Sequence, residues 1–284
     1  MSISPIFESQ VDEETKKIYQ KLKQAFGVSK PPIFFCYLAP FYDYFFYITN
    51  QIIANLKNEK FIEIINETND IILKLIKESF KKSEETTNFV NRFKYSPRFF
   101  YFQKDLEKIF EINLKLTFIF IALREAVKGW AIAAKKIGAK TESVDFSSKP
   151  KVDEEELIFN LNEVVDLKEK TKKHKKDIQG FSKAVINTPF SAIERDLLPS
   201  YLQLCRNDFY LLMKKEEYVF IRLEIEKIVL RFLAILPELI LSPVNLVIEM
   251  TKKYTDYPDL LYLLSEHFPT IIVQRLMFSG YVRE

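Results

Sequence analysis

Hydrophobic residues recur every three or four positions along this chain, which is the period of an α-helix. In residues 12–25, Ile18, Leu22 and Ala25 are three or four positions apart, so they share one face of a helix. Acidic residues open the segment, where the helix dipole favours negative charge, and Gly27 follows it, where glycine commonly ends a helix. The pattern predicts an amphipathic helix that ends at Gly27.

The same period runs through most of the remaining chain. It predicts helices over residues 33–56 (with a kink or restart at Pro40), 61–81, 88–102, 104–136, 153–176, 196–215, 217–236, 243–254, 258–264 and 269–282. The chain has only 5 glycines in 284 residues, which leaves little scope for the tight turns of β-hairpins. We therefore predict an all-α fold.

Two parts of the sequence carry the same landmarks in the same order. The matched landmarks are Thr15-Lys-Lys with Thr171-Lys-Lys, Pro40-Phe-Tyr42 with Pro199-Ser-Tyr201, Asn58–Phe61 with Lys215–Tyr218, and Gly129 with Gly280. This order predicts two tandem repeats of a multi-helix module, packed about a pseudo-two-fold axis. The alternative is that the similarity arises by chance between lysine-rich amphipathic helices.

The expected repeats are separated by a segment with the composition of a linker. Residues 138–150 are rich in small and polar residues and end in proline. We divide the chain into a first helical repeat at 1–137, a linker at 138–152 and a second helical repeat at 153–284. A pocket between the two repeats is the expected ligand site.

Composition and charge narrow the class of protein. Hydrophobic residues make up 48% of the chain, as in a globular protein. The formal net charge is only +3, and the sequence contains no nucleic-acid-binding motif. We therefore expect no nucleic-acid partner. The apolar runs at 116–127 and 228–241 are interrupted by charged residues and are too short for a clean membrane span. The chain opens without a leader pattern. We expect a soluble, cytoplasmic protein that does not enter a membrane.

The few residues with reactive side chains do not cluster. Cys36 and Cys205 lie on apolar helical stretches, which predicts two buried thiols, with a disulfide between the repeats as the alternative. Neither cysteine lies at metal-ligand spacing from His174 or His267, so no metal site is expected.

A family resemblance spans nearly the whole chain. It rests on Val11–Lys23 with Gly27-Val28, Pro32-Ile-Phe-Phe-Cys-Tyr-Leu-Ala, Asn113–Ala122 with Ala126 and Gly129, Val185-Ile-Asn-Thr, and Pro199-Ser-Tyr-Leu. In these residues the chain resembles the DehI-type 2-haloacid dehalogenases. The resemblance implies an all-helical, two-repeat and often dimeric enzyme that hydrolyses 2-haloalkanoic acids to 2-hydroxy acids without a cofactor. A small carboxylic acid between the repeats and a second copy of the chain are the implied partners.

The same resemblance implies a set of site residues. The family's asparagine falls on Asn113, and its aspartate, which is taken to activate the attacking water, falls on Pro189. The implied substrate-binding residues are Phe34, Phe35, Leu38, Thr188 and Phe190. Proline carries no acid–base group, so the family reaction lacks its base here. The alternative function is a non-catalytic homologue that binds a small carboxylate or serves as a structural helical dimer.

Other polar residues are open to a functional or a structural interpretation. Asn113 lies in an apolar run, where an amide needs a hydrogen-bond partner, so it is either a site residue or a satisfied structural amide. Glu194 and Asp196 follow Pro189 and are candidate replacement bases, or else solvated residues. Arg195, Arg206 and His267 are further candidates. The arginines are carboxylate anchors or surface ion-pair partners, and His267 is a pocket residue or lies at a helix start before Pro269.

Overall fold

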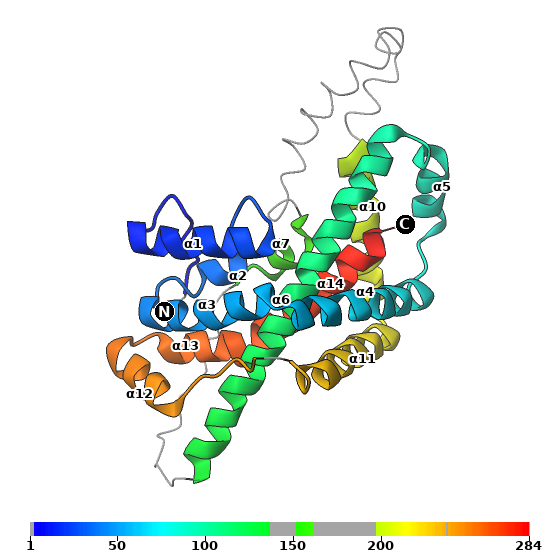
Figure 1. Cartoon of the computed structure of the whole chain (residues 1–284). Helices are drawn as coiled ribbons and strands as arrows, with labels where there is room; N and C mark the ends of the chain where they lie inside the picture. Colours follow the sequence, from blue (N-terminus) through cyan, green and yellow to red (C-terminus); the bar gives the residue numbers. More distant parts are fainter. Residues whose placement is uncertain (1–2, 137–151, 162–196, 237, 284) are drawn as a thin grey trace.

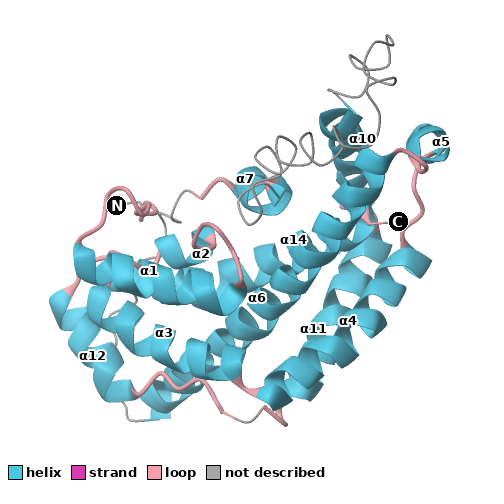
Figure 2. Cartoon of the chain, turned by 45° about the horizontal axis from the view of Figure 1, so that its top comes forward, coloured by secondary structure: helices cyan, strands magenta, loops and turns pink. Residues whose placement is uncertain are grey.

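The computed structural model describes residues 3–136, 152–161, 197–236 and 238–283, and these residues fold into helices and loops without a β-strand (Figure 1; Figure 2). The prediction of an all-α fold is confirmed. In chain order the helices are α1 Glu13–Phe26, α2 Ile33–Cys36, α3 Tyr42–Lys57, α4 Glu59–Ser79, α5 Glu84–Phe93, α6 Pro97–Lys136, α7 Glu154–Phe159, α10 Leu197–Leu212, α11 Glu216–Leu233, α12 Val244–Lys253, α13 Tyr257–Tyr262, the π-helical turn η2 Leu263–His267, and α14 Phe268–Val282.

Local sequence signals set the ends of α1. The side chain of Asp12 accepts a 2.7 Å hydrogen bond from the Thr15 amide, and this cap satisfies a backbone donor that a helix start leaves unpaired. Gly27 follows with a φ of 69°, a left-handed conformation that costs glycine little. The predicted helix and its end at Gly27 are confirmed.

Some expected boundaries are confirmed and others differ in the structure. The restart expected at Pro40 within 33–56 is confirmed, because α2 ends at Cys36 and α3 begins at Tyr42. The helix expected from residue 104 begins instead at Pro97, since proline suits the first turn of a helix. The helix expected over 153–176 ends at Phe159 within the described residues, and Asn160 leaves the helical conformation.

Helices α6 and α14 form the centre of the fold and run antiparallel (Figure 1). Almost every side of α14 is buried, which is typical of a helix surrounded by protein. Contacts between the two helices pair increasing residue numbers on α6 with decreasing ones on α14: Phe110 with Gly280, Asn113 with Arg275, and Phe120 with Phe268. Lys128 of α6 continues this order with Glu266 of η2, just before α14. Residues far apart in the sequence therefore meet along one interface.

The order of the described helices follows the landmarks of the expected repeat. Helices α3, α4 and α5 have 16, 21 and 10 residues, and α10, α11 and α12 have 16, 18 and 10. Helix α4 packs on α11, as α6 packs on α14. The two-repeat organisation and its boundaries at 137 and 153 stay predictions, because residues 137–151 lie outside the described part of the chain.

Cys36 and Cys205 are both buried thiols, not partners in a disulfide. Within the described ranges, no helix is long and apolar enough to cross a lipid bilayer.

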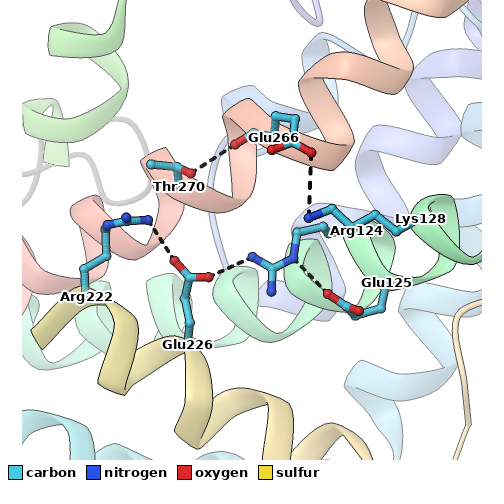
Figure 3. A network of polar contacts seen from close by, with 7 residues as sticks. All are labelled: Arg124, Glu125, Lys128, Arg222, Glu226, Glu266 and Thr270. Atoms are coloured by element: carbon cyan, nitrogen blue, oxygen red, sulfur yellow. Dashed lines mark hydrogen bonds and ion pairs between the residues drawn. The ribbon is translucent and has the colours of Figure 1, made fainter. Parts of the chain in front are cut away.

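A network of charged residues ties α6 to α11 and the C-terminal helices (Figure 3). Glu226 of α11 accepts hydrogen bonds from Arg124 of α6 at 2.8 Å and from Arg222 at 2.9 Å. Burial lowers the pKa of Arg124, but its hydrogen bonds to Glu226 and Glu125 outweigh this and raise the pKa above its usual value. Because both Glu226 oxygens are used, this carboxylate is the centre of the network.

Candidate functional site

Asn113 is a fully buried amide in the middle of α6. Its exposed fraction is 0%, and its neighbours Ile112 and Leu114 are buried too. The side-chain oxygen Oδ1 accepts a 3.0 Å hydrogen bond from Nε of Arg275. The amide nitrogen Nδ2 has no hydrogen-bond partner within the described residues, and an unpaired buried donor is costly in a folded protein.

The partner of Asn113 is a buried arginine on the central helix. Arg275 of α14 is 1% exposed, and its Nη1 donates a 2.8 Å hydrogen bond to the carbonyl oxygen of Leu157 in α7. Arg275 therefore joins α6, α7 and α14 at one point. Sequence reasoning missed this residue. The signal was a single basic residue in the apolar segment 268–282, since a buried arginine almost always has polar partners.

The aromatic residues expected in the substrate pocket lie along the same interface. Phe34 packs its ring 5.5 Å from that of Phe120 on α6 and 5.4 Å from that of Phe268 on α14. Phe120 and Phe268 are each seven residues from the Asn113–Arg275 pair, about 10 Å along the helices. Phe35 packs on Phe120 as well.

Phe34, Phe35 and Leu38 are all buried in the core. The structure thus brings Phe34 and Phe35 to the α6–α14 interface, as an aromatic layer about two helical turns from Asn113.

The candidates around Pro189 fall in a part of the chain that the structure does not describe. They are Thr188, Pro189, Phe190, Glu194, Arg195 and Asp196. Described helix α7, which precedes them, packs on α14 and carries the carbonyl that Arg275 binds.

Arg206 is held in a partly exposed ion pair. Its Nη2 lies 2.6 Å from Glu155 and 3.3 Å from the hydroxyl of Tyr210. The hydrogen bond with Tyr210 and the pairing with Glu155 raise the pKa of Arg206, although partial burial opposes this. The alternative interpretation of Arg206 as an ion-pair partner is confirmed.

His267 is the last residue of η2 and precedes α14. Its ring contacts Tyr262 and Phe268, and Nε2 lies 3.8 Å from Glu154. His267 thus lies where α7 meets the start of α14. This position agrees with the interpretation of His267 as a residue at a helix start.

A cavity of about 340 Å³ is lined by residues of α7, α10 and α14, among them Glu156, Phe159, Leu202, Arg206 and Phe278. Asn113 and Arg275 do not line it. In the described part of the chain no group of three or more histidine, cysteine or acidic residues is placed to hold a metal ion.

The fold of this chain matches solved structures of D-2-haloacid dehalogenases, although its sequence matches no family model. No protein-family model matches the sequence, and no curated protein matches it. A D-2-haloacid dehalogenase mutant in complex with D-2-CPA superposes with a TM-score of 0.64 and 18% identity over 99% of this chain and 94% of its own. A D-2-haloacid dehalogenase in complex with L-LA gives a TM-score of 0.63 and 17% identity, over 99% and 95% of the two chains. A third structure, of a mutant enzyme, gives 0.65 and 18%, over 98% and 94%. The chain has the all-helical fold of these dehalogenases.

Proposed function

We propose that this protein binds a small 2-substituted carboxylic acid beside Asn113, between its two halves, and belongs to the functional class of the cofactor-independent 2-haloacid dehalogenases. The observation that carries the proposal is the buried amide of Asn113 on α6, paired with Arg275 on α14. A buried amide with an unused donor is costly in an apolar core, and a bound anion or water removes that cost.

The aromatic layer and the fold add support. Phe34, Phe120 and Phe268 close the α6–α14 interface with apolar rings, and an apolar wall weakens the solvation of a bound anion. The structural neighbours hold D-2-CPA and L-LA in the same fold. Phe35, Leu38, Thr188 and Phe190 complete the proposed ligand-binding set.

The proposed reaction is displacement of halide from the 2-carbon by water. The water oxygen attacks that carbon, halide leaves with the electron pair of the carbon–halogen bond, and the water loses one proton to a base. Pro189 stands where the family has its aspartate and cannot accept that proton. Hydrolysis therefore needs another carboxylate, and Glu194 and Asp196 are the proposed candidates.

Halide release from racemic 2-chloropropionate tests this proposal. A general base contributes about 10²- to 10⁴-fold to a rate, so Pro189→Asp is expected to raise halide release by at least about 10²-fold over the unmodified protein. Adding Asn113→Ala to Pro189→Asp is expected to abolish the gain. Any release by the unmodified protein is expected to disappear in Glu194→Gln or Asp196→Asn. The absence of both binding and turnover in the unmodified protein and in Pro189→Asp would contradict the proposal.

Pro189 favours a second candidate function, a non-catalytic homologue that binds the acid without converting it. Calorimetry with 2-chloropropionate and lactate separates the two: binding without halide release at high protein concentration is the result expected for the non-catalytic homologue.

A homodimer is proposed through the outer face of α11. Phe220 is 60% exposed on this helix, and Val219, Leu223 and Leu230 are exposed along its length. Glutamates begin α11 and Arg231 lies in its last turn, so two copies paired antiparallel place opposite charges together. Phe220→Glu is expected to turn a dimer into a monomer in analytical ultracentrifugation, whereas Leu211→Glu on α10 is the control. A monomer in the unmodified protein would refute the pairing.

A further inference from the structure

The contact between Asn113 and Arg275 settles which way the buried amide points. Arginine has five N–H donors and no acceptor, so the Asn113 atom 3.0 Å from Nε of Arg275 is the carbonyl oxygen. The amide NH₂ group must then point the other way. A side-chain amide is otherwise free to turn by half a rotation, and the two orientations differ in whether they offer a donor or an acceptor.

We infer that Arg275 is a positioning residue that holds the Asn113 amide with its NH₂ group as the donor of the ligand site. The inference rests on the proposed function and names the group that meets the ligand. Asn113 is fully buried, and Nδ2 has no acceptor within the described residues. Nδ2 therefore donates its hydrogen bond to an acceptor of the ligand. In the proposed site this acceptor is a carboxylate oxygen or the departing halide.

Arg275 is itself held in place by a second contact. Its Nη1 donates to the Leu157 carbonyl at 2.8 Å, from α7, and the side chain is 1% exposed. A planar guanidinium with two of its donors fixed has little freedom to rotate. Its positive charge also lies beside the amide, and it favours an anionic ligand over a neutral one in a poorly solvated site. We assign a small monocarboxylate as the ligand class.

The replacement Asn113→Asp separates the positioning contact from the ligand contact. Aspartate keeps an acceptor oxygen for Nε of Arg275 but removes the NH₂ donor and adds a negative charge. We expect Asn113→Asp to retain or raise the melting temperature and to weaken binding of 2-chloropropionate and lactate by at least tenfold in calorimetry. An Asn113→Asp protein that binds both acids as tightly as the unmodified protein would overturn the inference.

Changing the arginine tests the positioning role itself. Arg275→Lys keeps the charge and a donor, so it is expected to restore part of the acid binding that Arg275→Met loses. In ¹⁵N-edited NMR spectra, the Asn113 side-chain NH₂ signals, identified by their loss in Asn113→Asp, are expected to shift in Arg275→Met. Arg283→Met at the end of the same helix is the matched control and leaves them in place.

The two readouts distinguish failure of the inference from failure of the proposed function. If the unmodified protein binds neither acid while Arg275→Met moves the Asn113 NH₂ signals, the proposed function fails and the orientation of the amide stands. If acid binding is normal and Arg275→Met leaves both the NH₂ signals and the binding unchanged, the positioning role of Arg275 fails and the proposed function stands.

Discussion

The protein is expected to lose its stability between pH 10 and pH 12, because it buries neutral phenols that the unfolded chain ionises. Burial raises the pKa of Tyr44 from 10.0 to about 12, and the hydrogen bond with Ser242 only partly opposes this. Burial also raises the pKa values of Tyr19, Tyr218 and Tyr257. In each case the folded state keeps its proton at a pH where the unfolded state has lost it.

The sign of the effect follows from proton binding. Above pH 10 the folded state binds more protons than the unfolded state, so the free energy of unfolding falls as the pH rises. Each such tyrosine contributes about 1.4 kcal/mol per pH unit, and the four together about 5 kcal/mol per unit. The loss over one to two pH units is comparable with the whole free energy of unfolding of an ordinary domain, about 5–15 kcal/mol.

Denaturant unfolding at pH 9, 10, 11 and 12, followed by circular dichroism, measures this slope. Tyr44→Phe is expected to flatten the slope by up to about a quarter, since it removes one of at least four contributing groups. Tyr95→Phe is the matched control, because Tyr95 is 85% exposed. A free energy of unfolding that stays constant from pH 10 to pH 12 would contradict the prediction.

Replacing Glu226 with glutamine is expected to lower the free energy of unfolding by about 3 kcal/mol. Glu226 is the shared partner of Arg124 and Arg222, and the side chains of Arg124 and Glu226 are only 12% and 13% exposed (Figure 3). Removing one member of a buried ion pair leaves an uncompensated charge, which costs about 3–5 kcal/mol. We take the lower end, because Arg124 keeps its contact with Glu125.

Glu224→Gln is the matched control on the same helix. Among the described residues Glu224 pairs with Lys227 alone, and the Lys227 side chain is 57% exposed, so this change is expected to cost less than about 0.5 kcal/mol. Urea unfolding of both variants at neutral pH measures the difference. Equal losses for Glu226→Gln and Glu224→Gln would show that α6 and α11 do not depend on the central carboxylate.

The local pattern of residues predicted most of the helices but not all of their limits. Asp12 and Gly27 mark the ends of α1 by short-range chemistry, and both limits are confirmed. The end of α7 at Phe159 was not predicted. The lysine-rich pattern continues beyond that point, and amphipathic periodicity does not specify where a helix stops without a capping residue.

The sequence drew attention to part of the candidate site, which stays a prediction. Asn113 was conspicuous as an amide in an apolar run, and the family resemblance implied Phe34 and Phe35 as substrate-binding residues. Arg275 was not expected. It is the single basic residue of the apolar segment 268–282, but the sequence does not show which polar group such an arginine contacts. Only its contact with Asn113 across 162 residues of sequence gives it a role.

The all-helical class follows from the amino-acid pattern, since helical periodicity is a property of short segments and glycine is scarce throughout the chain. The pattern also shows that position 189 has no acid–base group. The antiparallel pairing of α6 with α14, with Asn113 against Arg275, emerges from the folded chain alone, as does the contact of Glu226 with two arginines. Periodicity shows which face of a helix is buried, whereas the partner of that face depends on how the whole chain packs.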